Sequence, residues 1–196
     1  MKGHDIGLLL KLVSLHKQEQ NFEFDKTENG LEDACLKSDL LAQYTARMLE
    51  TETGISKSQI NLALNRCLDV GLAKKDRRLG VPRVHTKALY NLIVHGVKYV
   101  FPVKPGEITR GIATAFAAPV LNDKLMSAGE LVLIWPDAKG SIKGQAVEPI
   151  FKSAVYAALK DAEMYAFLAL VDAIRIGQPR EANLAGGLLK KRLAIK

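Results

Sequence analysis

The chain has 196 residues, of which 48% are hydrophobic and 25% are charged, and its formal net charge is +7. This is the composition of an ordinary folded protein with room for one large or two small domains, and it argues against extensive disorder. The positive charge predicts attraction to polyanions. The apolar residues 6–13 are too few to cross a bilayer and no secretory signal pattern opens the sequence, so we expect a cytoplasmic protein with no membrane partner.

The first predicted helix covers residues 5–16, where aliphatic residues recur at helical spacing and Asp5 is placed to cap the N-terminus. Residues 19–39 follow, with seven acidic residues against two lysines and an Asn-Gly pair among them. This segment is predicted to be a long polar loop. Ser38 is placed to cap a further short helix that reaches Tyr44.

Residues 45–71 contain two short helical patterns separated by Gly54, an arrangement typical of a helix-turn-helix. The second pattern has an apolar stripe and a polar opposite face. Ser56 and Gln59 match a capping box at its start, and Gly71 is placed to end it in the left-handed conformation. An ordinary helical hairpin inside a core is the alternative. The apolar stripe consists of Ile60, Ala63, Leu64, Cys67 and Leu68.

A basic run follows and surrounds the Gly-Val-Pro turn at residues 80–82. Between Lys57 and Lys87 there are eight Lys or Arg residues against two aspartates, so most of the net charge falls in this stretch. A basic hairpin directly after a helix-turn-helix is typical of a winged-helix DNA-binding domain, to which we assign residues 1–98. A solvated basic loop would have the same composition.

The second half of the chain predicts a small mixed domain, residues 99–196, that begins at the proline- and glycine-containing segment 99–106. Immediately before it, Thr86 is placed to cap a helix over residues 87–95 that ends at Gly96. Residues 107–121 show no clean period and are expected to be extended or irregular.

Apolar runs at residues 131–135 and 142–148 flank turn residues and predict a β-hairpin. A long helix is predicted over residues 155–176 and a last one over residues 180–193. The whole pattern predicts an α+β fold, an N-terminal winged helix-turn-helix domain followed by a small mixed α/β domain with a hairpin and C-terminal helices. The predicted solvent side of the long helix contains Lys160, Asp161, Asp172 and Arg175.

Residues that could carry catalysis or hold a metal are scattered along the sequence. Cys35 and Cys67 form no C-x-x-C pair and are expected to be reduced structural thiols. His85 and His95 are ten residues apart, which is not the spacing of a helical ligand pair. There is no G-x-x-x-x-G-K-[ST] phosphate loop and no G-x-S-x-G nucleophile elbow. We therefore expect no enzyme, no cofactor and no metal site.

The second half also carries a family resemblance. It lies in the segments HGVKYVFPVKPGEITRGIATAFAAPVL, IWPDAKGSIKGQAVEPIFKSA and FLALVDAIRIGQPRE, and with the first half it resembles AbiEi-like antitoxins, small bacterial winged-helix proteins often found beside nucleotidyltransferase genes. The resemblance implies an N-terminal winged helix, a C-terminal domain and repression of the protein's own operon. Leu62 departs from many winged-helix regulators, which present a polar DNA-contacting residue at this position. The resemblance transfers no catalytic residue.

The first functional hypothesis is a sequence-specific DNA-binding regulator whose helix enters the major groove while the basic run holds the phosphates. Asparagine side chains there could read adenine through two hydrogen bonds, whereas Lys and Arg on the hairpin would position the domain. The candidate DNA-binding residues are Lys57, Ser58, Gln59, Asn61, Asn65 and Arg66 of the helix and Lys74, Lys75, Arg77, Arg78 and Arg83 of the basic run.

Two further partners are expected besides double-stranded DNA. The C-terminal domain could bind and restrain another protein, such as a toxin, with DNA binding secondary. A homodimer would pair two half-sites, and the helices at residues 87–95 and 155–176 are its candidate surfaces unless they pack the two halves of one chain together.

Overall fold

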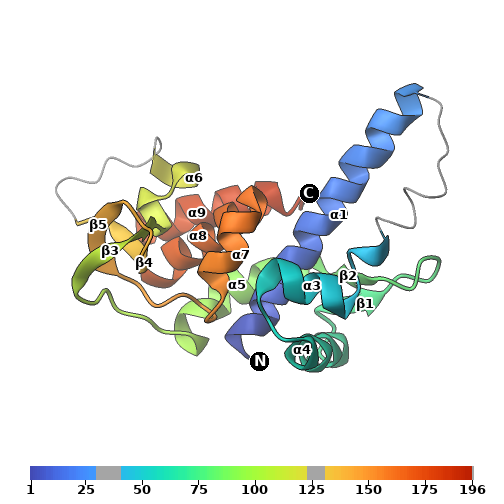
Figure 1. Cartoon of the computed structure of the whole chain (residues 1–196), viewed down its shortest axis with the longest axis horizontal. Helices are drawn as coiled ribbons and strands as arrows, with labels where there is room; N and C mark the ends of the chain where they lie inside the picture. The colour runs from blue at the N-terminus through green and yellow to red at the C-terminus, as the bar shows by residue number, and fades with distance from the viewer. Residues whose placement is uncertain (30–40, 123–130, 196) are drawn as a thin grey trace. The chain divides into compact units, whose positions relative to one another are not determined.

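The computed structural model describes residues 1–29, 41–122 and 131–195, of which residues 21–29 are described by their backbone. The chain is a mixed α+β protein that forms two compact units, Met1–His85 and Thr86–Lys196 (Figure 1). The division lies before the predicted boundary at residues 98–99, because the helix that follows His85 packs against helices of the second unit.

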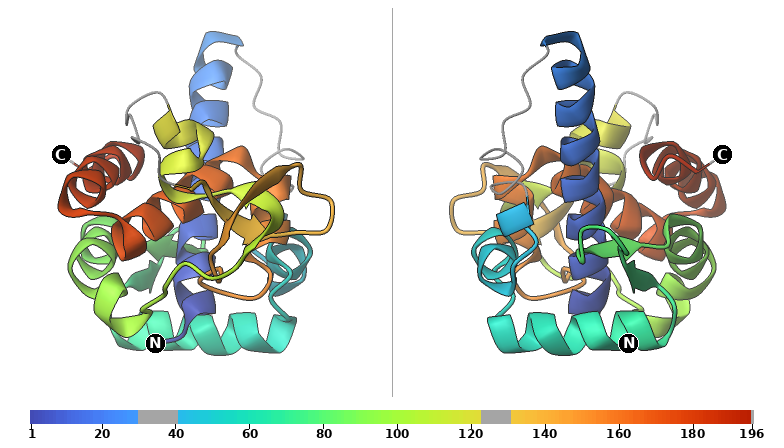
Figure 2. Two further views of the ribbon diagram at one scale, coloured as in Figure 1. Left: turned by 90° about the vertical axis from the view of Figure 1, so that its left-hand side faces the viewer. Right: turned by 90° about the vertical axis from the view of Figure 1, so that its right-hand side faces the viewer.

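Unit 1 consists of helices and one antiparallel hairpin. The long helix α1 contacts α3, α4 and β2. Helix α4 crosses α1 near the N-terminal end of α1 (Figure 2). Aliphatic residues of α1 are buried with Ile60, Ala63 and Cys67 of the α4 stripe and form the core, whereas Leu64 and Leu68 of the stripe are half-buried. The elements are α1 (Gly3–Asn29), α3 (Ala46–Thr53), α4 (Lys57–Asp69), β1 (Ala73–Lys75) and β2 (Pro82–Val84).

Helix α1 is longer than predicted. It continues to Asn29, so the prediction of a polar loop from residue 19 is wrong for residues 19–29, and the remainder of that prediction lies outside the described residues. This segment is rich in Glu, Gln and Lys, which propagate a helix well, and it contains no Pro or Gly before residue 30. Asp5 is also not the N-cap. It lies in the first turn, where its carboxylate accepts a hydrogen bond from the Lys2 N–H.

The helix ends at residues 45–71 agree with the prediction because they are specified locally. Gly54 ends α3 with a φ of 67°, in the left-handed region. The Ser56 hydroxyl accepts from the Gln59 N–H at the start of α4, which is the first of the two capping-box bonds. At the other end Gly71 has a φ of 74°, and the N–H groups of Gly71 and Leu72 bond the carbonyls of Leu68 and Cys67 in a Schellman motif.

Unit 2 is built around helix α8, which packs against α5, α6, α7, α9 and η1 (Figure 1). All but one of the residues from Met164 to Arg175 are buried, so α8 is surrounded by other elements rather than amphipathic. The elements are α5 (Thr86–Val100), β3 (Ile108–Ala113), η1 (Ala115–Ala117), α6 (Pro119–Asn122), β4 (Leu133–Pro136), β5 (Ile142–Ala146), α7 (Ala154–Lys160), α8 (Ala162–Ile176) and α9 (Pro179–Arg192).

The strands of unit 2 form a small closed barrel, and the predicted hairpin is wrong. Strands β4 and β5 run parallel to each other, and β3 is antiparallel to both. Gly111 of β3 pairs with Pro136 at the end of β4 and with Ile142 at the start of β5. Strand β3 therefore changes its pairing partner at this residue. A β-carbon at Gly111 would lie 1.9 Å from the carbonyl oxygen of Trp135. Only glycine permits this close approach of two strands.

Two helix predictions in unit 2 need correction. Helix α5 runs through Gly96 to Val100, because Leu89, Ile93 and Val97 continue its buried face. The long helix predicted from residue 155 is divided at Asp161, whose carboxylate caps α8 by accepting from the N–H groups of Glu163 and Met164.

The predicted solvent side of the long helix is wrong at Asp161, which is 8% exposed, and at Asp172 and Arg175, which are 1% and 6% exposed. Asp172 and Arg175 form a buried ion pair of 2.7 Å. The other Asp172 oxygen accepts from the Trp135 indole N–H at 2.6 Å and the Thr114 hydroxyl at 2.9 Å, and Arg175 also donates to the Phe101 carbonyl. The charges are tolerated because each has partners.

Of the candidate dimer surfaces, the apolar faces of α5 and α8 are covered within unit 2, whereas the α7 part of the segment 155–176 exposes Tyr156 and Leu159, at 45% and 68%. Neither face therefore needs a second chain to bury it. Among the described residues, no helix has the length and apolar character needed to cross a membrane.

Candidate nucleic-acid interface

The outward face of α4 presents polar side chains in one stripe. Ser58, Asn61, Leu62 and Asn65 follow the i, i+3, i+4, i+7 spacing that places residues on one side of a helix, and all four are exposed. The opposite stripe is buried in the core of unit 1, so α4 cannot turn this face inward. Two amides and a hydroxyl are thus held in a row on a rigid helix.

The N-terminal turn of α4 is also exposed, at Lys57, Ser58 and Gln59. Its backbone is tied to α3, because the Glu50 carboxylate accepts a hydrogen bond from the Lys57 N–H at 3.1 Å. A carboxylate at a helix N-terminus is stabilising, and here it joins the two helices. It also occupies the Lys57 N–H group, which a phosphate could otherwise use.

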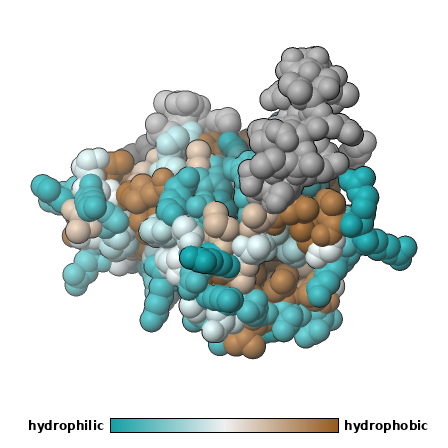
Figure 3. Space-filling view, turned by 45° about the vertical axis from the view of Figure 1, so that its right-hand side comes forward, coloured by the Kyte–Doolittle hydropathy of each residue, from teal (hydrophilic) through white to brown (hydrophobic). Residues whose placement is uncertain are grey.

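The hairpin after α4 displays the basic run. Lys74 and Lys75 on β1 and Arg77 and Arg78 at the turn are exposed, and none of them forms an ion pair with a residue that the structure describes. Long hydrophilic side chains project at the right-hand edge of the surface, where this hairpin lies (Figure 3). The basic charge is therefore free to meet a polyanion.

Asp76, the acidic residue within this run, is used by the turn itself. Its carboxylate accepts from the N–H groups of Leu79 and Arg78, both at 2.8 Å, and these bonds hold the pKa of Asp76 below its ordinary value. Gly80 completes the turn with a φ of 68°.

Arg83 does not belong to the exposed basic surface, which corrects its assignment as a phosphate contact. Its guanidinium donates to the Glu19 carboxylate at 2.5 and 2.8 Å and to the Tyr44 hydroxyl at 2.8 Å, and its side chain is 12% exposed. A guanidinium nitrogen of Arg83 also lies within hydrogen-bond distance of His16, 2.8 Å from its Nδ1. Arg83 therefore anchors β2 to α1.

Arg66 is also engaged within unit 1, although its side chain remains 32% exposed. Its guanidinium forms two hydrogen bonds to the carboxylate of Asp5, at 2.6 and 3.0 Å, and the Asp5 side chain is fully buried. Burial raises the pKa of Asp5, but the bonds from Arg66 and from the Lys2 N–H outweigh it, so the pKa is lowered overall. Arg66 lies at the side of α4 that faces α1 and fastens the two helices together.

The residues that sequence reasoning missed are the acidic partners of these arginines. Glu19 is 64 residues from Arg83 and Asp5 is 61 residues from Arg66, so no local spacing could reveal either pair. Of the eleven candidates, nine stay on the exposed surface of unit 1, and the list without Arg66 and Arg83 is Lys57, Ser58, Gln59, Asn61, Asn65, Lys74, Lys75, Arg77 and Arg78.

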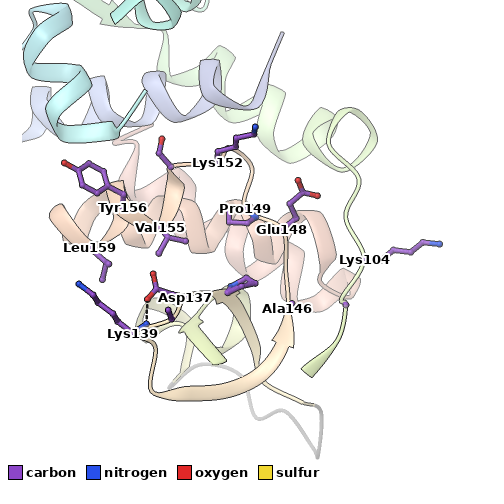
Figure 4. Close-up of a pocket in the computed structure, with 14 residues that line it drawn as sticks. Lys104, Asp137, Lys139, Ala146, Glu148, Pro149, Lys152, Val155, Tyr156 and Leu159 are labelled. Atoms are coloured by element: carbon purple, nitrogen blue, oxygen red, sulfur yellow. Dashed lines mark hydrogen bonds between the residues drawn. The ribbon is translucent and has the colours of Figure 1, made fainter. Parts of the chain in front are cut away.

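Unit 2 has a groove of about 820 Å³ between the turn after β4 and helix α7 (Figure 4). Tyr156 and Leu159 project from α7 on one side and are 45% and 68% exposed. Asp137 and Lys139 lie on the other side, where the Asp137 carboxylate accepts from the Lys139 N–H. The groove is apolar on one wall and charged on the other.

Searches of protein-family models, curated proteins and solved structures find no match for this chain. Within the described part of the chain, no group of three or more His, Cys, Asp or Glu side chains is arranged to hold a metal ion.

Proposed function

We propose that unit 1 is a winged-helix DNA-binding domain and that the protein is a sequence-specific transcriptional regulator. The observation that carries the proposal is the juxtaposition in one unit of an exposed amide stripe on α4 and a hairpin with four exposed cations. Helix α4 would enter the major groove as the recognition helix.

The two parts of this surface suit different roles. Asn61 and Asn65 have the amide donor and acceptor that match the N7 and N6 edge of adenine, so they would read bases. Lys74, Lys75 and Arg78 lie on the hairpin, outside the helix that would enter the groove, so they would bind phosphates and position the domain.

The proposal includes repression of the protein's own operon as an antitoxin-like regulator, which rests on the resemblance to AbiEi-like antitoxins. The direct test is binding of the full chain to its own upstream DNA and to a scrambled duplex of equal length, over a series of salt concentrations. We expect tighter binding to the upstream DNA and a logarithmic salt slope of several units on both. Equal affinity for both duplexes would refute sequence specificity, and no binding to either would refute the proposed function.

A second candidate function is protein binding through unit 2, which the groove beside α7 supports. Tyr156 and Leu159 lie three residues apart on α7 and expose apolar surface that a partner could cover. Co-expression with the product of the adjacent gene tests it. A complex that forms with the wild type and is lost in Tyr156→Ala would support this function, and its persistence in that variant would contradict a role for the groove.

A further inference from the structure

We propose that Leu62 reads thymine, by packing its side chain against the C5 methyl group of a thymine in the major groove between the bases read by Asn61 and Asn65. This inference rests on the proposed DNA-binding function and names the bases that α4 selects. The recognised sequence would contain adjacent A·T pairs.

The position of Leu62 is the first reason. It precedes Asn65 by three residues, so these two side chains are neighbours on the helix surface, and it follows Asn61 by one residue, about 100° around the same exposed side. A duplex that meets Asn61 and Asn65 must also meet Leu62. The opposite face of α4 is buried, so DNA can approach only the exposed side of the helix, which contains Leu62 and both amides.

The exposure of Leu62 is the second reason. Its side chain is 59% exposed, whereas Ile60, Ala63 and Cys67 of the same helix are 1% exposed or less. Leu62 thus contributes little to the core of unit 1. Single exposed leucines are common on protein surfaces, and the argument depends on where this one lies, at the centre of a stripe of otherwise polar side chains.

The chemistry of the A·T pair supplies the third reason. Its major-groove edge presents an acceptor and a donor on adenine and an acceptor and a methyl group on thymine. An asparagine amide satisfies the adenine, and an aliphatic side chain satisfies the methyl group. Cytosine presents an N4 amino donor in place of the thymine oxygen and has no methyl group, so a leucine against it would cover a donor without bonding it.

Two-step binding experiments can test the inference. A random pool of double-stranded DNA is first selected by the full-length wild-type protein. In the selected duplex each thymine is then replaced singly by deoxyuridine, which removes the methyl group and keeps the base pairing. We expect one replacement to weaken wild-type binding about fourfold, the effect of one buried methyl-sized group.

Leu62→Ala should bind the unmodified duplex more weakly and show no further loss with that deoxyuridine. Val70→Ala is the matched control, because Val70 is a 64% exposed apolar residue at the end of α4 and off the stripe, so it should keep both the affinity and the deoxyuridine effect.

The inference is overturned if the wild type tolerates every deoxyuridine, or if Leu62→Ala retains the full deoxyuridine effect. It is also overturned if selection yields no preferred sequence while salt-dependent binding persists, a result that leaves non-specific DNA binding intact. Absence of any DNA binding would overturn the proposed function itself and the inference with it.

Discussion

The guanidinium of Arg83 on β2 and the carboxylate of Glu19 on α1 form two hydrogen bonds, of 2.5 and 2.8 Å, across 64 residues of sequence. Both side chains are nearly buried, at 12% and 10% exposed. The hairpin is therefore anchored at its base by one arginine, whereas Arg77 and Arg78 at its turn extend to solvent. Arginines of one short hairpin thus lie in different environments, one nearly buried in an ion pair and two exposed.

Arg83→Ala should destabilise unit 1, because the Glu19 carboxylate then stays buried without the guanidinium that forms its ion pair. Breaking a buried pair in this way costs about 3 kcal/mol of unfolding free energy. Arg78→Ala, the matched control on the same hairpin, should change stability by less than about 0.5 kcal/mol. Urea denaturation followed by circular dichroism measures both. Equal stability of the two variants would contradict the anchoring role of Arg83.

Asn61→Ala and Arg78→Ala should weaken DNA binding in different ways. Loss of the Asn61 amide should cost about 1–3 kcal/mol on the preferred duplex and little on a scrambled one. Loss of Arg78 should weaken both duplexes alike and reduce the logarithmic salt slope by about 1. Fluorescence anisotropy titrations at several salt concentrations check this, and parallel losses on both duplexes for both variants would refute the division between base reading and phosphate binding.

Unit 1 should lose stability in acid through Glu19. Burial raises the pKa of Glu19, but the bonds from Arg83, His16 and Tyr44 outweigh it, so the folded pKa lies below the ordinary value. A lowered folded pKa means that the unfolded chain takes up the proton first. The stabilisation is therefore complete above the ordinary glutamate pKa of about 4.3 and is lost as the pH falls through the folded value.

Glu19→Gln should accordingly be less stable than the wild type at pH 7, and its unfolding free energy should fall less steeply between about pH 5 and pH 2. Asp5, whose pKa is also lowered, should supply part of the remaining slope. Urea denaturation at a series of pH values measures the slopes. An unchanged slope in Glu19→Gln would show that this carboxyl does not link folding to pH.

Thr114→Val should destabilise unit 2 by about 1–2 kcal/mol, because it removes a hydroxyl donor from the buried Asp172 carboxylate with little change of volume. Trp135 is the single tryptophan of the chain and donates to the same oxygen, so its fluorescence reports directly on this network during unfolding. Thr51→Val on the exposed face of α3 is a matched control and should cost less than about 0.5 kcal/mol. A loss in the control as large as in Thr114→Val would assign the effect to the substitution type rather than to the network.

The thiol of Cys67 should be inert in the folded protein. The side chain is fully buried in the core of unit 1, and burial raises its pKa to about 12, so the reactive thiolate is scarce at neutral pH. In a Cys35→Ser background, alkylation by iodoacetamide at pH 8 should be slow without urea and fast once unit 1 unfolds. Rapid labelling under native conditions would mean that α4 opens readily from α1.

The sequence by itself determined the features of unit 1 that depend on neighbouring residues. The end of α3 and both ends of α4 follow from Gly54, Ser56 and Gly71, because a cap is a hydrogen bond to a backbone group only a few residues away and the left-handed conformation favours glycine. The buried stripe of α4 follows from spacing, since a helix repeats every 3.6 residues. The polar candidates on its opposite face, apart from Arg66, are exposed for the same reason.

Only the tertiary structure decided which charges are available and how the strands of unit 2 pair. The sequence does not distinguish the environment of Arg66 from that of Arg78. In the structure Arg66 forms an ion pair with Asp5 on α1, whereas Arg78 is exposed to solvent. Helical spacing predicted that Asp172 faces solvent. Its carboxylate is instead buried and accepts hydrogen bonds from Thr114 and Trp135, which come from other parts of the chain. Residue type and spacing specify what a side chain can bond, whereas its partner depends on which distant segment the fold brings beside it.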